Sequence, residues 1–275
     1  MLKYILGVLA LLIVLLGSCV LIVVLPQYKA SEKRYTDVKN FKSKGEVQMI
    51  AHRGLSGLKM ENTLPAFEEA GKRSYYGIET DVHVTKDGKF IITHDDDLKR
   101  IVGLDWEIEE TTFAELRALR FKDINGTSEE KTLYLPSLEE YISICKKYNK
   151  QAILELKNEM TKELVWEIAE SIKAQGWFDR TTFISFSGNN LVWLREKYKD
   201  ANAQFLTEKY TEEDVKFMLE NKLDGDFCWA YVKKSTVKRM HEAGLKVNVW
   251  TVNGKACAAL MKWNGVDYIT SNILE

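Results

Sequence analysis

The feature that most constrains the fold of this chain is an alternation that runs from residue 46 to residue 275. Short runs of β-branched and aromatic residues, five to seven residues long, alternate with amphipathic segments. The short runs are typical of buried strands, and the longer segments carry apolar residues at helical spacing. Strands that alternate with helices indicate a parallel sheet, because a helix connects each strand to the next. The sequence therefore predicts one α/β domain over residues 46–275.

The alternation gives nine candidate strands and seven candidate helices. The expected strands are Val47–His52, Ile78–Val84, Phe90–His94, Ala152–Lys157, Thr181–Phe186, Ala203–Thr207, Leu223–Phe227, Lys246–Thr251 and Val266–Thr270. The expected helices are Thr63–Arg73, Ser137–Lys147, Glu163–Ala174, Asn190–Lys199, Glu212–Asn221, Ser235–Ala243 and Lys255–Trp263. Residues 98–135 show few clear elements, and we interpret them as an inserted region that caps the active face.

Nine strands are one more than an eight-stranded barrel needs, and a turn signal indicates the extra one. Asp87-Gly88 is typical of a two-residue hairpin loop. A two-residue loop at Asp87-Gly88 pairs residues whose numbers add up to 175, so Asp81 would face His94. The run Phe90–His94 is then a return strand, and the other eight strands fit a (β/α)₈ barrel, which also suits the chain length. An open doubly wound sheet is the alternative.

Charge is unevenly distributed along the chain, although the formal net charge is −1. Residues 1–45 carry seven Lys or Arg and two acidic residues, which leaves a net charge of −6 for residues 46–275. An acidic domain argues against a nucleic-acid substrate, because phosphate contacts need a basic surface. The four cysteines form no CxxC or CxxH pair, so we expect neither a disulfide framework nor a zinc site.

The N-terminus begins with an uncharged apolar run, Tyr4 to Leu25, of 22 residues. A helix of that length spans about 33 Å, enough to cross a bilayer core. The sequence therefore predicts a single-pass transmembrane anchor over residues 1–26. It predicts a basic juxtamembrane linker over residues 27–45, next to the membrane surface.

Processing and orientation of this segment leave alternatives open. Leu16-Gly17-Ser18-Cys19 is similar to a lipoprotein cleavage site, and ordinary signal-peptide cleavage is a further alternative. The apolar run continues past Cys19, which favours a retained anchor. More Lys and Arg follow the helix than precede it, which favours a cytoplasmic domain, whereas Lys3 beside the amino terminus suits an exported one.

Polar residues gather at the carboxyl ends of the early strands, where (β/α)₈ barrels place their active sites. Residues two apart in a strand share a face, so paired acids there point the same way. We expect a shared site built from His52, Arg53, Glu79, Asp81, His94, Asp95, Glu155 and Lys157.

These motifs resemble the glycerophosphodiester phosphodiesterase family. The likeness covers nearly all of residues 47–272, in order. The matching stretches are Ile50-Ala-His-Arg-Gly54, Glu61-Asn-Thr-Leu-Pro-Ala-Phe67, Glu79-Thr-Asp-Val-His83, Thr85-Lys-Asp-Gly88, His94-Asp95, Leu135-Pro-Ser-Leu-Glu139, Leu154-Glu-Leu-Lys157 and Val249-Trp-Thr-Val-Asn253. The resemblance implies a (β/α)₈ barrel of the phospholipase-C-like phosphodiesterase type, in agreement with the strand count.

The resemblance also implies roles for individual residues. It assigns Glu79, Asp81 and Glu155 as ligands of one divalent cation, and three carboxylates suit Mg²⁺ or Ca²⁺ rather than zinc. His52 and His94 match the acid/base pair of the family.

Further matches bear on substrate binding. Arg53 and Lys157 are implied as phosphate-binding residues, and Trp250 as a residue that packs against the glycerol end of the substrate. Glu61 and Asn62 match a motif near the site. The sequence Thr270-Ser271-Asn272 departs from the Thr-Asp common in the family, and we interpret this departure as lying outside the metal and histidine set.

The function that follows is metal-dependent hydrolysis of glycerophosphodiesters to an alcohol and glycerol 3-phosphate, in phospholipid and glycerol metabolism. We expect a small-molecule substrate, a membrane location through the N-terminal helix, and no nucleic-acid partner. Two alternatives remain at this point. One is a lysophospholipase-D-like or phosphoinositide-type enzyme that acts on lipid in the bilayer, and the other is a tethered binding protein whose barrel has lost catalysis.

Overall fold

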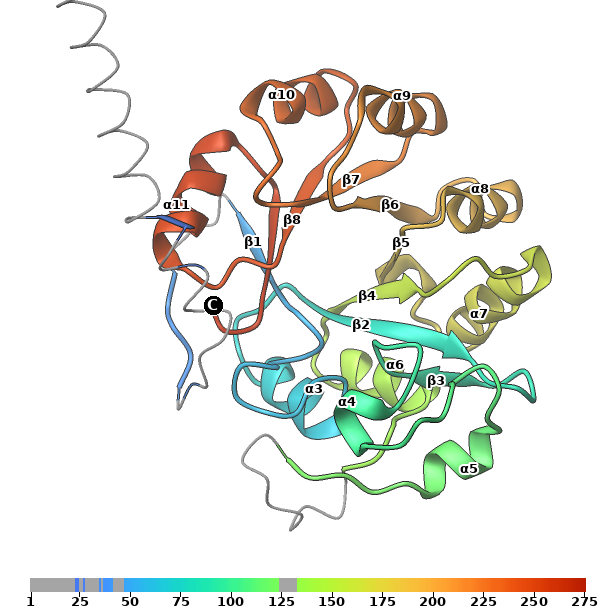
Figure 1. Cartoon of the computed structure of the whole chain (residues 1–275). Coiled ribbons are helices and arrows are strands. Elements are labelled where there is room, and N and C mark those ends of the chain that lie inside the picture. The colour runs from blue at the N-terminus through green and yellow to red at the C-terminus, as the bar shows by residue number, and fades with distance from the viewer. Residues whose placement is uncertain (1–22, 25–26, 28–34, 36, 42–46, 124–132) are drawn as a thin grey trace, which may run out of the picture.

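The computed structural model describes residues 23–24, 27, 35, 37–41, 47–123 and 133–275. Within them, nine strands form a single sheet in the order β1-β9-β8-β7-β6-β5-β4-β2-β3, and a further pairing joins β1 to β2. That pairing closes eight parallel strands into a barrel, with helices around the outside (Figure 1). The predicted barrel is confirmed, and the open doubly wound sheet is excluded.

Every predicted strand is present, with ends that differ by no more than two residues. The strands are β1 (Gln48–Ala51), β2 (Gly77–Val84), β3 (Phe90–Ile92), β4 (Gln151–Leu156), β5 (Thr181–Ser185), β6 (Asn202–Thr207), β7 (Asp224–Cys228), β8 (Val247–Trp250) and β9 (Tyr268–Ser271).

Strand β3 is the return strand of a hairpin, as predicted, but its register differs by one residue. It pairs antiparallel with β2, and the paired positions are Val82 with Ile92 and Val84 with Phe90, which sum to 174. The loop therefore has three residues instead of two and contains Gly88 with φ of +71°. Three-residue hairpin loops commonly place glycine in this left-handed conformation. In this register the backbone N–H of Thr93, not of His94, donates to the carbonyl of Asp81, at 3.1 Å.

The seven predicted helices lie close to their predicted positions. They are α3 (Leu64–Gly71), α6 (Leu138–Lys147), α7 (Lys162–Ala174), α8 (Gly188–Lys197), α9 (Glu212–Asn221), α10 (Lys234–Glu242) and α11 (Lys255–Asn264). The short helices α4 (Lys99–Val102) and α5 (Phe113–Ala118) and a 3₁₀ turn at Phe178–Arg180 were not predicted. Several begin at a hydroxyl side chain that accepts from the first turn. Ser137 and Thr211 form capping boxes at α6 and α9, with Glu140 and Asp214 as the acidic partners.

The buried apolar residues of the barrel itself separate into a large layer between the strands and the helices and a small cluster inside the barrel. The inner cluster comprises Ile50, Ile153, Ile184, Leu206 and Tyr268, which come from five different strands. A filled interior of this kind is usual in such barrels. Polar side chains that point into the barrel can therefore reach solvent only at its open ends.

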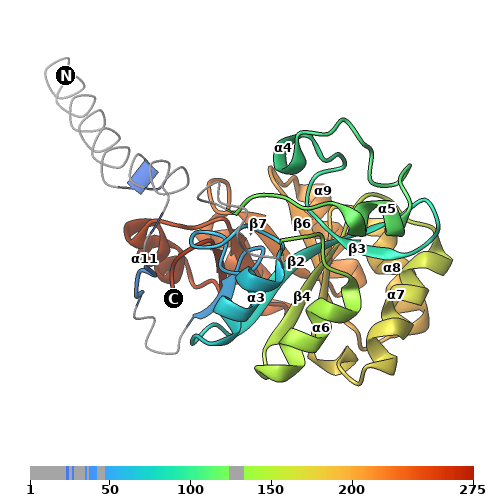
Figure 2. The same cartoon turned by 90° about the horizontal axis from the view of Figure 1, so that it is seen from below.

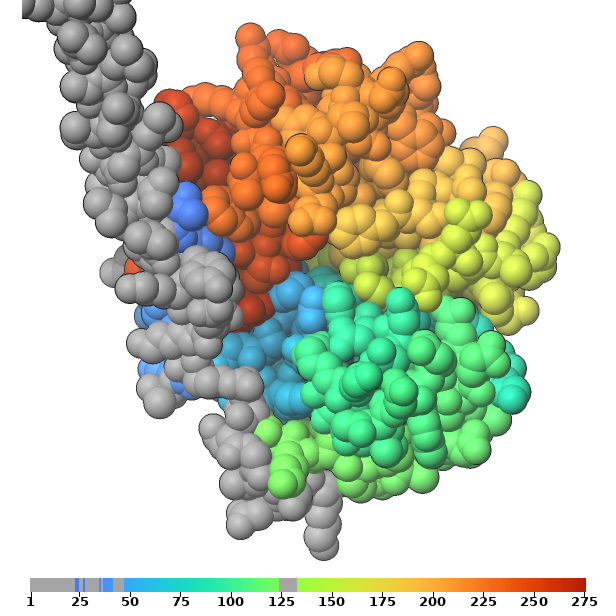
Figure 3. Space-filling model, in the orientation of Figure 1, coloured from blue at the N-terminus to red at the C-terminus, as the bar shows by residue number. Residues whose placement is uncertain are grey.

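The inserted region 98–135 contains two short helices and, within the described residues, has an apolar cluster of its own. Ile91, Leu98, Ile108, Leu116 and Leu133 are fully buried in that cluster. Helices α4 and α5 lie on the same side of the barrel (Figure 2). In the space-filling view the green atoms of this region border a hollow that the orange C-terminal half borders from the other side (Figure 3).

The predicted anchor lies almost entirely outside the described residues, and it stays a prediction. No helix in the described part of the chain has the length and apolar character needed to cross a membrane. In the predicted linker, the backbone N–H of Lys39 donates to the carbonyl of Ile273 at 3.0 Å. The N–H of Glu275 donates back to Lys39 at 3.1 Å. Residues 37–41 therefore pack beside the C-terminal residues of the barrel.

Candidate active site

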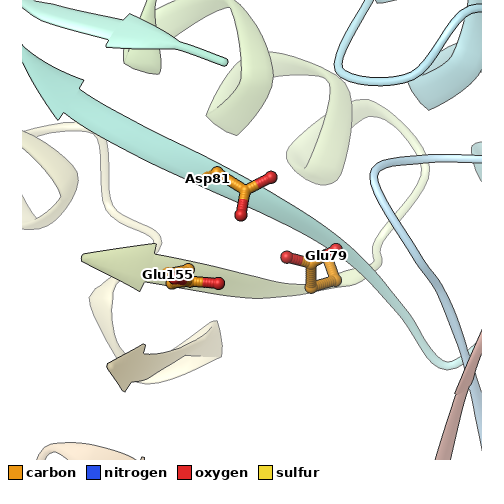
Figure 4. A group of neighbouring side chains, drawn as sticks. All are labelled: Glu79, Asp81 and Glu155. Carbon is orange, nitrogen blue, oxygen red and sulfur yellow. The ribbon is translucent and has the colours of Figure 1, made fainter. Parts of the chain in front are cut away.

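Three carboxylates converge at the carboxyl ends of β2 and β4. Glu79 and Asp81 are two apart on β2, and Glu155 is the direct parallel partner of Asp81 on β4. Their side chains point toward one another (Figure 4), and one oxygen from each lies within 4.8 Å of the others. All three residues are buried. The alternation of side chains along a strand brings them to one face, as the spacing predicted.

Burial and mutual repulsion set the electrostatics of this group. Burial first, and then the charge of Asp81, raise the pKa of Glu79 well above its usual value, against the attraction of Arg53. The same two influences raise the pKa of Glu155 to about 8. Burial also raises the pKa of Asp81, but Arg53 and neighbouring cationic groups outweigh it and hold that pKa at about 2.

The loop after β1 holds Arg53 against these carboxylates. Arg53 has φ of +52° and Gly54 has φ of +73°. A Cβ atom on Gly54 would lie 2.7 Å from the backbone of Ala66, so glycine is required there. In this conformation the backbone N–H of Arg53 donates to Oε2 of Glu79 at 2.7 Å. Its guanidinium Nε lies 3.8 Å from Oδ2 of Asp81. Uncommon backbone angles of this kind cluster at functional sites.

The Glu61-Asn62 motif supports the same loop. Glu61 accepts from the guanidinium of Arg53 at 2.9 Å. Asn62 donates its amide to Oδ2 of Asp81 at 2.8 Å and accepts from the hydroxyl of Thr80 at 2.7 Å. The motif therefore orients Arg53 and Asp81, and it lies beside the group of three carboxylates without being part of it.

His52 follows β1 and faces Asn272 at the end of β9. Its Nδ1 atom lies 2.6 Å from Oδ1 of Asn272. On the other side of the ring, Nε2 lies 4.0 Å from Oε2 of Glu79. Burial and then the positive charge of Arg53 lower the pKa of His52 to about 3, against the hydrogen bond with Asn272. The ring is therefore neutral at pH 7, and its Nε2 is directed toward the carboxylates.

His94 follows β3 and is bound by a carboxylate instead of an amide. Its Nδ1 lies 2.8 Å from Oδ1 of Asp95. Arg100 of α4 holds Asp95 in turn, with its Nε 2.7 Å from Oδ2, and donates to Glu61 at 2.7 Å. Burial lowers the pKa of His94, and the charge of Asp81 opposes this. Asp95 therefore orients His94 through a charged network that reaches Arg53.

Two cavities open beside the carboxylates. The smaller, about 110 Å³, is lined by His52, Arg53, Glu79, His94, Glu155, Ile184, Phe186, Leu206, Asp226, Trp250 and Thr270. The larger, about 570 Å³, is lined by His94, Asp95, Asp96, Asp97, Glu155, Leu156, Lys157, Asn158, Glu159, Phe186 and Ser187. Lys157 Nζ lies 2.9 Å from Oε1 of Glu155. The structure thus brings every predicted site residue to one region, with His94 and Glu155 shared by both cavities.

Comparison with known proteins decides the family. The family model described as glycerophosphoryl diester phosphodiesterase family matches residues 52–274. The chain belongs to this family. The predicted family and its enzyme class are confirmed, and the matched range includes all eight predicted site residues.

Individual members of the glycerophosphoryl diester phosphodiesterase family agree. The chain is 27% identical to YhdW of Bacillus subtilis, over 82% of this chain and 93% of that protein. It is 31% identical to a glycerophosphodiester phosphodiesterase of Bacillus altitudinis, over 53% of this chain and 60% of that protein. A phosphodiesterase of Oleispira antarctica, solved in complex with the product sn-glycerol-3-phosphate, is 25% identical with a TM-score of 0.72. That comparison covers 85% of this chain and 96% of that one.

Three residues of this site were missed or misplaced by the sequence analysis. Asn272 was interpreted as lying outside the metal and histidine set, and the structure shows that it contacts one of the two histidines, His52, directly. Arg100 lies in the inserted region, where no pattern indicated a site residue. Asp226 lines the smaller cavity. Its spacing from Asp224 repeats the two-residue spacing of Glu79 and Asp81, a signal that could have identified it.

Proposed function

We propose that this chain is a metal-dependent hydrolase of glycerophosphodiesters that releases an alcohol and glycerol 3-phosphate, as part of phospholipid metabolism. The observation that carries the proposal is the placement of two imidazoles around one carboxylate group. His52 and His94 line the same cavity as Glu79 and Glu155, and each has its Nδ1 engaged by a neighbour. Both Nε2 atoms are then available for proton transfer at a substrate.

The carboxylates fit a divalent cation as ligands. Glu79, Asp81 and Glu155 offer oxygens within 4.8 Å of one another. Burial and mutual repulsion raise the pKa values of Glu79 and Glu155, so it costs free energy to keep both carboxylates ionised. A bound cation would remove this cost. Carboxylate oxygens, with no thiolate among them, suit a hard ion, Mg²⁺ or Ca²⁺. When bound, such an ion supplies charge stabilisation at a phosphate oxygen.

The side chains of the chain itself bind the phosphate and transfer the protons. The Nε atom of Arg53 is buried without a hydrogen-bond partner among the described residues, and it is placed to donate to a phosphate oxygen. Lys157 adds a second cation at the rim of the site. His52 accepts a proton from the attacking oxygen, and His94 donates one to the departing alkoxide. Trp250 and the apolar wall around it exclude water from one side of the cavity.

The test is release of glycerol 3-phosphate and choline from glycerophosphocholine. Activity should be lost after chelation and return when Mg²⁺ or Ca²⁺ is added. Lysophosphatidylcholine, assayed in parallel, distinguishes an enzyme that acts on lipid. A purified, folded chain that binds a divalent cation but hydrolyses neither compound would contradict the proposal and favour a binding protein.

We further propose that residues 1–26 are retained as a membrane anchor, which rests on the 22 uncharged residues from Tyr4 to Leu25. Mass spectrometry of the mature chain tests this. A first residue at or beyond Cys19 would contradict a retained anchor.

A further inference from the structure

Asp226 is a buried carboxyl group whose surroundings leave one oxygen unpaired. On β7 it is the parallel partner of Leu206 on β6 and of Asn248 on β8. It is 1% exposed, and its Oδ1 has no hydrogen-bond partner among the described residues. Asn248 is engaged with Thr270, donating to its hydroxyl at 3.0 Å and accepting from it at 3.2 Å. Buried polar atoms without a partner are uncommon and call for an explanation.

The cavity that Asp226 lines also contains a second unpaired polar atom. This is Nε1 of Trp250, which is buried and has no partner among the described residues. Ile184 and Leu206 line the same cavity and make part of its wall apolar. At about 110 Å³ the cavity is far smaller than the roughly 300–1,000 Å³ of pockets for drug-sized ligands. It therefore suits a small group that carries hydroxyls on an apolar carbon chain.

The charge state of Asp226 favours the same kind of ligand. Burial raises the pKa of Asp226 to about 8, against a hydrogen bond with Asn248. The carboxyl is therefore protonated at neutral pH and can both donate and accept a hydrogen bond. An uncharged carboxyl group beside an indole N–H offers little attraction to a cation but complements an alcohol.

We propose that Asp226 and the indole N–H of Trp250 bind a hydroxyl group of the glycerol moiety and so select glycerol diesters over diesters of simple alcohols. This inference rests on the function proposed above. The small cavity lies beside His52 and Arg53, whereas the larger cavity extends past Lys157 to the exterior. Glycerol therefore occupies the small cavity, and the departing alcohol faces the larger one.

The experiment compares two substrates with the same leaving group, glycerol 3-(p-nitrophenyl phosphate) and propyl p-nitrophenyl phosphate. The full chain with Mg²⁺ should prefer the glycerol diester in kcat/KM by about 10-fold to 100-fold, because buried polar groups that meet no hydroxyl are left unpaired. Asp226→Leu, which keeps the shape of the side chain, should abolish most of this preference, because it lowers kcat/KM for the glycerol diester more than for the propyl diester. Asp226→Asn, which retains a donor and an acceptor, should keep most of the preference.

Two further measurements separate recognition from scaffold effects. Gln204→Leu replaces another buried polar residue inside the barrel that does not line this cavity, and it should leave the preference unchanged. Competitive inhibition by glycerol 3-phosphate should weaken relative to propyl phosphate in Asp226→Leu.

The outcomes distinguish this inference from the proposed function. If the wild-type chain hydrolyses neither diester, the proposed function fails. If it hydrolyses both equally well, or if Asp226→Leu keeps the preference, only the hydroxyl-binding role is overturned. An equal loss on both substrates in Asp226→Leu, or an Asp226→Asn variant that behaves like Asp226→Leu, also overturns it.

Discussion

The Nδ1 atom of His52 lies 2.6 Å from the amide oxygen of Asn272. An amide oxygen can only accept, so Nδ1 carries the proton and Nε2 carries the lone pair. His94 differs, because its Nδ1 faces the carboxylate of Asp95 at 2.8 Å. A carboxylate stabilises a protonated imidazole, which a neutral amide does not do to the same extent. The two partners thus suit His52 to accept a proton and His94 to donate one.

This difference predicts unequal rescue of the two histidine variants by an acidic leaving group. His52→Ala and His94→Ala should each lower kcat on glycerophosphocholine by about 10²-fold to 10⁴-fold, the usual contribution of a general acid or base. A p-nitrophenyl diester needs no proton on its leaving group, so it should restore His94→Ala far more than His52→Ala. Steady-state kinetics on both substrates measure the effect, and rescue of His52→Ala instead would reverse the two roles.

The distances along the chain explain what the sequence could predict. Strands and helices were predicted well because each depends on periodicity within about ten neighbouring residues, as at β2 and α9. The pair of Asn272 and His52 joins residues 220 positions apart, and only closure of the barrel through β1 and β9 brings them together. The predicted hairpin register was one residue off because a three-residue loop with Gly88 replaces the expected two-residue loop.

Part of the site was nevertheless predictable. Glu79, Asp81 and Glu155 were identified from their spacing on strands, because side chains two apart share a face whatever the rest of the fold. Asp226 has the same spacing from Asp224, but an acid in a lone strand is more often exposed to solvent. Its burial follows from the position of β7 in the closed barrel, which local sequence does not record.

Arg100 offers a test of the charged network that orients His94. Arg100→Ala removes the partner of Asp95 and should lower kcat roughly fivefold, for a coupling of about 1 kcal/mol. Its effect on stability should be small, because Arg100 is half-exposed. Arg117→Ala is a matched control, since Arg117 forms a similar paired contact with Glu140 between α5 and α6. That control should keep kcat, and equal losses in both variants would contradict a positioning role for Arg100.

Glu79→Gln should separate the stability of the metal-free chain from its affinity for metal. Removing one of three buried, mutually repelling carboxylates should raise the melting temperature in the presence of a chelator. The same change removes a charged ligand, so the increase in melting temperature on adding Mg²⁺ should shrink. A wild-type site with Mg²⁺ at 100 times its Kd gains about 2.7 kcal/mol. Thermal unfolding with and without metal measures both effects, and a Glu79→Gln variant with an undiminished metal response would contradict the assigned ligand.

Truncation tests whether the segment before the barrel contributes to the fold or to the site. Fragments that begin at residue 35 and at residue 47 both retain every predicted catalytic residue, so both should hydrolyse water-soluble diesters. The shorter fragment loses the backbone bonds of Lys39 and the packing of Phe41, and should be less stable by about 1–3 kcal/mol. Melting temperatures and kcat of the two fragments measure this.

The contrary outcome of the truncation would be informative. Gln27 donates to the carbonyl of Thr251 at 2.6 Å and accepts from the backbone of Gly254 at 2.7 Å, in the loop that follows Trp250. A fragment from residue 35 that folds but is inactive, beside an active full chain, would make the segment around Gln27 part of the site.

The last prediction concerns pH and follows from the raised pKa of Asp226. Its pKa is about 8 in the folded chain, against 3.8 for an ordinary aspartate. The folded state therefore holds this proton more tightly than the unfolded state does. The stability from the protonated carboxyl is fully present below pH 4 and declines as pH rises through about 8. Asp226→Asn cannot ionise, so it should lack this decline.

The comparison is made between wild type and Asp226→Asn at pH 5 and at pH 8, by thermal unfolding with chelator present. Each unit of pKa shift corresponds to about 1.4 kcal/mol. The difference in free energy of unfolding between the two proteins should therefore shift in favour of Asp226→Asn by on the order of a few kcal/mol from pH 5 to pH 8. Groups shared by both proteins cancel in the difference, including the carboxylates of Glu79 and Glu155. If this difference in free energy of unfolding stayed constant from pH 5 to pH 8, Asp226 would be ionised in the folded chain. Its protonated form would then not be available to bind a hydroxyl.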